Sequence, residues 1–172
     1  MRLLSIIIFV LLIVGCQNRE SDNDKLFELA AKTINDSIND KNAFYVDTIR
    51  ILDTITENKY IDFLPIKRLN LFSDKDFDFM HSQNKIYAKN DLNELTKFGY
   101  KLIKINRLKT ILDYKHFKGF YVISKPLYSL DYHKALLNVD FVCYDVGRGY
   151  ILIMDKVNGK WELKRVLHTW IN

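Results

Sequence analysis

Cysteine and histidine are scarce in this chain. Its 172 residues include only two cysteines, Cys16 and Cys143, which excludes a disulfide scaffold and a zinc site built from several cysteines. Its four histidines are scattered between His81 and His168, so a histidine-rich metal centre is not expected either. We therefore predict neither a metal nor a cofactor.

The common catalytic motifs are also missing. The sequence contains no glycine-rich phosphate loop, no G-x-S-x-G, no H-E-x-x-H and no EF-hand loop. This absence weighs against the commonest enzyme classes, although many hydrolases carry no readable motif. We predict no catalytic residue from the sequence and keep an enzyme as an alternative.

What the chain does contain is enough apolar material for one domain. Hydrophobic residues make up 48% of it and aromatic residues 13%, with 11 Phe and 10 Tyr. These shares exclude wholesale disorder and can fill a core. A chain of this length has room for a single domain.

The first fifteen residues have the pattern of a secretory signal. Arg2 is followed by a nearly unbroken apolar run over residues 3–14, which is too short to cross ~30 Å of hydrocarbon as a helix. No later segment contains a comparable run. We therefore expect no membrane-spanning helix in the mature chain.

Ile13-Val14-Gly15-Cys16 resembles the lipobox of bacterial lipoproteins. The signal peptidase of that pathway needs a small residue before the cut, here Gly15, and a thiol after it, here Cys16. The Cys16 sulfur then carries diacylglycerol, and each buried methylene adds about 0.8 kcal/mol to membrane binding. Gln17 is similar to the sorting pattern for the outer membrane. The resemblance implies a lipid-anchored protein of the cell envelope, in the outer membrane, with its domain on either the periplasmic or the surface-exposed face.

The residues after Cys16 are polar and predict a solvated tether. The chain then divides into three parts. These are a signal peptide at 1–15, a lipidated cysteine with a flexible tether at 16–23, and one globular domain at 24–172.

The formal net charge of +5 is unevenly distributed. Residues 97–118 hold seven lysine or arginine residues against one aspartate. No RNP, helix-turn-helix or finger motif accompanies this basic stretch, and an exported protein rarely meets nucleic acid. We predict no nucleic-acid partner. A solvated face or attraction to anionic lipid headgroups explains the stretch, as does an acidic glycan or an acidic protein.

Helical spacing is clearest near the start of the domain. Residues 24–39 predict an amphipathic helix whose apolar stripe faces the core. A short helix at 90–98 is expected to stop at Gly99. The stripe of the first helix consists of Leu26, Phe27, Ala30, Ile34 and Ile38.

A further helix has a readable start. Ser73 and Asp76 have the spacing of a capping box, and Phe72 and Phe77 are placed as a hydrophobic staple. This pattern predicts a helix that runs to about residue 83.

The strand patterns are concentrated in the C-terminal third. Asn158-Gly159 is the strongest hairpin signal, and Gly147-Arg148-Gly149 is expected to supply another turn. Residues 100–112 fit a strand or a helix equally well. The predicted strands are 44–55, 60–66 with Pro65 at an edge, 117–124, 135–143, 150–157 and 160–170. The hairpin register predicts that Val157 faces Lys160, Met154 faces Leu163, Leu152 faces Arg165 and Tyr150 faces Leu167.

The predicted fold class is α+β, with an N-terminal amphipathic helix and short helices before a C-terminal antiparallel β-meander of about four strands. The chain carries the motifs Ser124-Lys125-Pro126, Gly147-Arg148-Gly149 and Asn158-Gly159-Lys160-Trp161, with Phe77-Asp78-Phe79-Met80 in the predicted helix. In these motifs residues 73–172 resemble a group of small Bacteroidota lipoproteins of unassigned function, and the resemblance implies no activity. A helix before a curved antiparallel sheet is also similar to the nuclear-transport-factor-like fold, whose members are enzymes or binders.

Four side chains on or near the last hairpin form a candidate binding surface, because amphipathic aromatic residues suit a sugar or a protein partner. They equally suit a sheet face packed against the N-terminal helix. The four residues are Tyr150, Trp161, His168 and Trp170.

Two further groups are weaker candidates. Asp140, Asp145 and Arg148 gather near the predicted Gly147 turn, where turn chemistry explains them. Cys143 alternates with apolar residues, which favours a buried, inert thiol over a nucleophile.

We predict that the domain is a non-enzymatic module that binds an envelope protein or a polysaccharide while acylated Cys16 holds it to a lipid bilayer. The alternatives are a small enzyme or ligand carrier with a pocket between helix and sheet, and a protective, immunity-type lipoprotein. An enzyme needs converging titratable groups in a pocket, whereas a binder needs an exposed aromatic patch, for which Trp161 and Trp170 are candidates.

Overall fold

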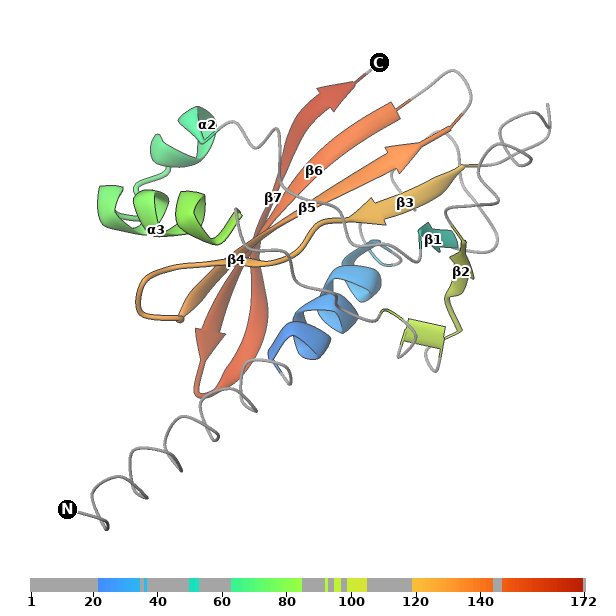
Figure 1. Ribbon diagram of the computed structural model, residues 1–172, viewed down its shortest axis with the longest axis horizontal. Helices are drawn as coiled ribbons and strands as arrows, with labels where there is room; N and C mark the ends of the chain where they lie inside the picture. The colour runs from blue at the N-terminus through green and yellow to red at the C-terminus, as the bar shows by residue number, and fades with distance from the viewer. Residues whose placement is uncertain are drawn as a thin grey trace, which may run out of the picture.

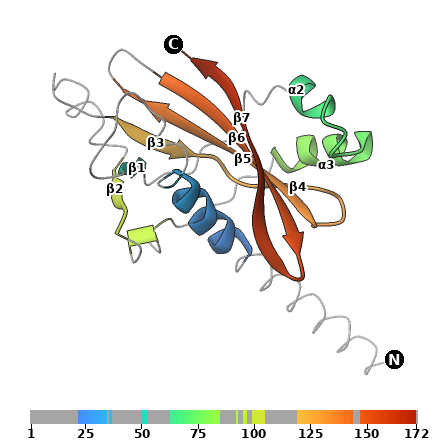
Figure 2. The ribbon, with the colours of Figure 1, turned by 180° about the vertical axis from the view of Figure 1, so that it is seen from behind.

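The computed structural model shows an α+β fold, as the sequence predicts, in which a mixed sheet carries helices on both faces (Figures 1 and 2). Gly15, Cys16 and the predicted signal lie outside the described residues, and so does the middle of the basic stretch. The structure describes residues 22–34, 36, 50–52, 63–84, 92, 95–96, 99–104, 119–143 and 147–171.

The sheet has seven strands in the order β2-β1-β3-β5-β6-β7, with β4 also paired to β5. β1 runs parallel to β2 and β3, and the other pairs are antiparallel. The predicted antiparallel meander of about four strands is not confirmed, because the sheet is mixed and has seven strands. β1 lies within the strand predicted at 44–55, and β2 lies within residues 100–112, which fit a strand or a helix. β4 has only two residues, which is too short to show an alternating pattern. The strands are β1 (Arg50–Leu52), β2 (Lys101–Ile103), β3 (Phe120–Ile123), β4 (Leu127–Tyr128), β5 (Lys134–Val142), β6 (Gly147–Val157) and β7 (Lys160–Ile171).

The turn between β6 and β7 is confirmed as Asn158-Gly159, and both residues have positive φ angles of 49° and 77°. This is the backbone that a two-residue hairpin of matching twist requires. Next to the turn the predicted register is also confirmed, because Val157 pairs with Lys160 and Met154 with Leu163.

Beyond Met154 the predicted register is wrong by one residue. The pairing shifts between Ile153 and Met154, which leaves Lys164 as the extra residue of a β-bulge. A strict two-residue period cannot anticipate such an insertion. Leu152 pairs with Val166 instead of Arg165, and Tyr150 pairs with His168 instead of Leu167.

The expected turn at Gly147-Arg148-Gly149 is also wrong. β6 begins at Gly147, and all three residues pair with β5 as part of the strand. Arg148 and Gly149 pair with β7 as well. Glycine is needed here for another reason, because the Trp170 side chain occupies the space that a Cβ atom would take at Gly147 and Gly149. The glycines thus make room on a sheet face instead of bending the chain.

A helix over residues 22–33, drawn in blue in Figure 1, packs against one face of the sheet, which we call the N-helix face. The predicted stripe is confirmed for Leu26, Phe27, Ala30 and Ile34, which are all buried, whereas Ile38 lies outside the described residues. On the sheet this face carries the alternating side chains of β5, from Ala135 to Phe141. Apolar area buried between the helix and the sheet forms the larger core.

The opposite face, which we call the α3 face, is partly covered by α2 (Leu64–Lys67) and α3 (Asp74–Asn84). Ile66, Phe77 and Met80 of these helices pack on Leu136 and Ile153 of the sheet. The strand predicted at 60–66 is therefore wrong where it is described. Pro65 stands in the first turn of a helix, where its missing N–H costs nothing.

The start of α3 is confirmed as a capping box. The Ser73 backbone N–H donates to Oδ2 of Asp76 at 2.8 Å, and the Asp76 N–H donates back to Oγ of Ser73 at 3.3 Å. The Phe72 and Phe77 ring centroids lie 5.9 Å apart, as a hydrophobic staple requires. Gly99 has a φ of 83°, which confirms it as a left-handed position, and β2 follows it.

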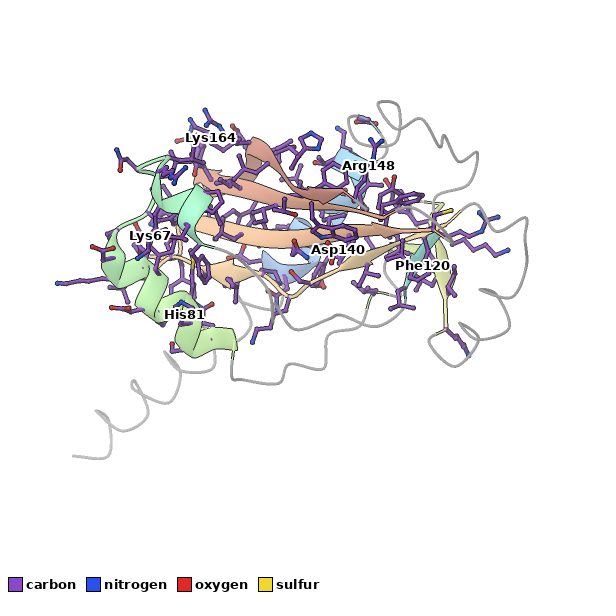
Figure 3. The ribbon with its side chains drawn as sticks, turned by 90° about the horizontal axis from the view of Figure 1, so that it is seen from above. Lys67, His81, Phe120, Asp140, Arg148 and Lys164 are labelled. Carbon is purple, nitrogen blue, oxygen red and sulfur yellow. The ribbon has the colours of Figure 1, made fainter. Side chains whose placement is uncertain are left out.

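α3 is fastened to β4 by side chains that bond to the backbone. The Gln83 amide donates to the Tyr128 carbonyl at 2.7 Å and accepts from its N–H at 3.0 Å. Oδ1 of Asp76 accepts from the Leu130 N–H at 2.8 Å. These bonds hold α3 over one part of the α3 face. The part of that face near the start of β6 is not beneath α2 or α3 (Figure 3).

Candidate functional site

The four aromatic and histidine side chains that the sequence places on one surface are separated by the sheet. Tyr150 and Trp161 are 2% and 8% exposed and pack in the core of the N-helix face, which is the alternative left open for them. His168 is exposed beside Tyr150, with the two ring centroids 5.0 Å apart. Trp170 lies on the α3 face and is 41% exposed. The predicted single surface is therefore wrong, and only Trp170 remains as its exposed aromatic residue.

A second β-bulge determines the face on which Trp170 lies. Gly149 pairs with Trp170 and Tyr150 with His168, so Thr169 is the extra residue between these pairs. Side chains two residues apart in a regular strand lie on the same face. Without the bulge, Trp170 would therefore share the N-helix face with His168. The bulge turns the indole to the opposite face.

The Trp170 indole lies along β6 on a floor of backbone. A Cβ atom at Gly149 would overlap Nε1 and Cδ1 of the ring, and one at Gly147 would overlap Cη2 and Cζ3. The ring therefore extends from one glycine to the next over the strand. One side of the indole is packed on peptide groups, and the residue nevertheless keeps 41% of its surface exposed.

Asp140 holds the polar edge of this indole. Nε1 of Trp170 donates to Oδ1 of Asp140 at 3.2 Å, across β6, and Nδ2 of Asn138 donates to Oδ2 at 2.9 Å. Asp140 and Asn138 are both half-buried. We call Trp170, Asp140, Asn138 and the two glycines beneath the ring, Gly147 and Gly149, the Trp170 cluster.

The Asp140 carboxylate is in an environment that disfavours its charge. Burial raises its pKa above the ordinary value, and the hydrogen bonds from Asn138 and Trp170 only partly offset this rise. Both bonded groups are neutral donors, and no cation contacts the carboxylate among the residues that the structure describes. A carboxylate has about four acceptor positions, and these two bonds occupy two of them.

The described residues next to the cluster on β3 and β5 are apolar. Val122 of β3 pairs directly with Asp140, and Val142 is half-buried beside Phe120. Thr169, in the bulge, is exposed and places its hydroxyl next to Gly149. Figure 3 shows Asp140 on the sheet between the area under α2 and α3 and Phe120.

The expected grouping of Asp140, Asp145 and Arg148 is not found. Asp140 pairs with Gly149, while Arg148 pairs with Phe141 and thus belongs to the N-helix face. Asp145 lies outside the described residues. The grouping assumed a turn at residues 147–149, and the continuous strand separates its members by alternation.

Sequence reasoning missed Asn138, Gly147 and Gly149 as parts of a site. The available signal was a pair of polar residues, Asn138 and Asp140, on the same face of an otherwise apolar strand. Gly147 and Gly149, also two residues apart, lie on the next strand and leave space above its backbone for a large side chain. The sequence does not predict which side chain fills this space, because that depends on the bulge at Thr169.

Cys143 is half-buried and packs against the larger core, so it is less buried than the sequence predicts. Within the described ranges no three His, Cys, Asp or Glu side chains form a group able to hold a metal ion. No described helix is both long enough and apolar enough to cross a membrane.

The fold and the Trp170 cluster define an α+β domain with a polar and aromatic site on a part of its sheet that the described helices α2 and α3 do not cover. No family model, no curated protein and no solved structure matches the chain.

Proposed function

We propose that this protein is a lipoprotein of the bacterial cell envelope, anchored through acylated Cys16, and that its domain is a non-enzymatic binding module. The Trp170 cluster is its binding surface. The observation that carries this proposal is the placement of Trp170, whose indole is fixed by Asp140 and two glycines yet remains 41% exposed. Core packing does not account for an indole held in this way, whereas aromatic anchors are typical of binding surfaces.

The contacts at the start of the domain favour a particular orientation on the membrane. Asp22 forms a 2.6 Å ion pair with Lys156, and Asn23 accepts a 2.5 Å hydrogen bond from the Tyr128 hydroxyl. Both contacts lie near the Asn158-Gly159 turn. The six Cα-to-Cα steps from Cys16 to Asp22 span at most about 20 Å when extended. The hairpin end of the sheet would therefore face the bilayer.

The Trp170 cluster lies at the other end of the same hairpin. Ten residues separate Lys160 from Trp170 along β7, and a strand rises about 3.3 Å per residue, so the separation is roughly 30 Å. In the proposed orientation the cluster points away from the anchoring membrane. This position suits a partner in the periplasm or at the cell surface better than the headgroups of the same bilayer.

Three finer parts of the proposal come from the sequence. They are placement in the outer membrane, relationship to the small Bacteroidota lipoproteins, and similarity of the domain to the nuclear-transport-factor-like fold. The enzyme and the protective lipoprotein remain alternatives that no specific contact among the described residues favours.

The anchor is tested by fractionation of cells that express the Cys16→Ser variant. We expect the variant in the soluble fraction and the unaltered protein in the membrane fraction. Cys143→Ser is the matched control and should remain in the membrane. Membrane retention of Cys16→Ser would contradict the anchoring proposal.

The binding surface is tested by photo-crosslinking from a reactive amino acid at Thr169, beside the cluster. The same group at Asn158, in the hairpin turn at the opposite end, is the control. We expect a discrete adduct from position 169 that is lost with Trp170→Ala and is absent from position 158. Identical adducts from both positions, or none from position 169, would contradict the assignment of the surface.

A further inference from the structure

We propose that the Trp170 cluster receives an arginine side chain from a partner protein, with the guanidinium bonded to Asp140 and stacked against Trp170. This inference rests on the proposed function and names the chemistry of its binding surface.

Charge complementarity is the first argument. Asp140 is half-buried, and each of its two hydrogen bonds comes from a neutral donor. Its neighbours across the sheet are Val122 on β3 and Gly149 on β6, and Trp170 and Thr169 approach from β7. None of these groups is charged. A buried carboxylate is costly unless it is paired, so a cation brought by a ligand would supply what the described residues do not.

The shape of the site favours guanidinium over ammonium. One side of the Trp170 ring packs on β6, and the residue is 41% exposed. The hydrogen bond from its Nε1–H holds the Asp140 carboxylate next to the edge of the ring. A planar guanidinium can stack on an indole and, through its parallel N–H groups, bond to the free acceptor positions of an adjacent carboxylate. An ammonium group offers a point charge without a stacking plane.

The setting favours a protein as the source of the arginine. Small ligands are usually bound in concave sites that cover most of their surface, whereas this cluster lies on a sheet face with an exposed indole. Half-buried Val122 and Val142 border it, and a partner's surface would exclude water from both the ion pair and these side chains. Tryptophan and arginine are the residues most enriched at the centres of such interfaces.

The experiment uses the lipidated protein in detergent micelles with its two tryptophans labelled with ¹⁵N. Only two indole N–H signals then appear, and Trp170→Phe assigns the signal of Trp170. The probe is Nα-acetyl-arginine amide, and the matched neutral probe is Nα-acetyl-citrulline amide. We expect a saturable shift of the Trp170 signal with the arginine probe, while the Trp161 signal stays in place and the citrulline probe has no comparable effect.

Asp140→Asn keeps the shape of the side chain and removes its charge. We expect this variant to bind the arginine probe at least about tenfold more weakly, as the loss of charge-assisted hydrogen bonds implies. Asp155→Asn changes a partly buried acid at the hairpin end and should leave binding unchanged. Thermal unfolding of each variant shows whether weaker binding has a structural cause. Unaltered binding by folded Asp140→Asn would overturn the inference.

A glycan is tested in the same way with chitotriose. A saturable Trp170 shift with this sugar and none with arginine would overturn the inference and leave the proposed binding module standing. Equal shifts with arginine and citrulline, or no shift with any probe, would overturn it as well. Failure of the lipid anchor is a separate result, because it is read from the fractionation of Cys16→Ser.

Discussion

Trp170 and Asp140 are joined by a 3.2 Å hydrogen bond that spans the strand between them. Trp170 is on β7 and Asp140 on β5, and the indole crosses β6 over two glycines to reach the carboxylate. The bond therefore couples three strands at the end of the sheet that α2 and α3 leave uncovered. It also fixes an exposed aromatic ring in one position, which would lower the entropy cost of the partner binding that we propose there.

The glycine floor can be tested with Gly149→Ala. The added methyl group overlaps the indole, so we expect Trp170 to leave the sheet, with a red shift of tryptophan fluorescence and a loss of about 1–3 kcal/mol in stability. Urea unfolding followed by circular dichroism measures the loss.

The double variant Gly149→Ala with Trp170→Ala is the control for this prediction. Because the overlap disappears with the indole, the two substitutions should be strongly non-additive, and the second should cost little once the first is present. Additive losses would show that Trp170 does not rest on Gly149.

Asp140 predicts a particular dependence of stability on pH. Its pKa is raised in the folded protein by burial, so the folded state holds the carboxyl proton more tightly than the unfolded state does. The associated stability is fully present below the unfolded pKa of about 3.8 and is lost as the pH rises through the higher folded pKa. We expect Asp140→Asn to be as stable as the unaltered protein or more stable at pH 7. Stability curves of the two proteins from pH 3 to pH 7 measure this, and a widening advantage of the unaltered protein with rising pH would contradict it.

For Asp76, at the other end of the α3 face, we expect stability to depend on pH in the opposite direction. Burial opposes its charge, but hydrogen bonds from the Leu130 N–H and from Ser73 dominate and lower its pKa. Its contribution is present above the unfolded pKa of about 3.8 and is lost as the pH falls through the lowered folded value. Asp76→Ala should cost about 1–3 kcal/mol through the lost cap and the unpaired Leu130 N–H. Asp74→Ala, an exposed neighbour, is the control and should cost less when both are compared by urea unfolding at pH 7.

The proposed orientation on the membrane predicts unequal distances from the lipid. A fluorophore on Asn158→Cys should be quenched by spin-labelled headgroups in vesicles more strongly than one on Thr169→Cys, in a Cys143→Ala background. The reason is the short reach from Cys16 to Asp22, which is paired with Lys156 near the turn. Equal quenching at both positions would rule out the proposed orientation.

Local chemistry explains which parts of the fold could be predicted from the sequence. The start of α3 was readable because Ser73, Asp76 and their flanking aromatic residues interact within one helical turn. The β6–β7 turn was readable because Asn158-Gly159 favours positive φ angles. In both cases the structure depends on neighbours in the sequence and little on distant contacts.

The errors arise where distant contacts decide the structure. The β-bulges at Lys164 and Thr169 break the two-residue period, and no local pattern marks their positions. They move the register by one residue and place Trp170 on the face opposite His168. The Trp170 cluster could therefore not be assembled from the sequence, although Asp140 and Trp170 are each candidate site residues in it.

The most direct test of the central claim compares binding and stability in one variant. Asp140→Asn is examined at pH 7 by thermal unfolding and by titration with Nα-acetyl-arginine amide. If the cluster is a binding surface, the variant unfolds at the same or a higher temperature and binds the probe at least about tenfold more weakly. If Asp140 serves only to hold the sheet together, the variant unfolds at a lower temperature and keeps the shift of the Trp170 indole signal that the probe causes in the unaltered protein. That result would contradict the account.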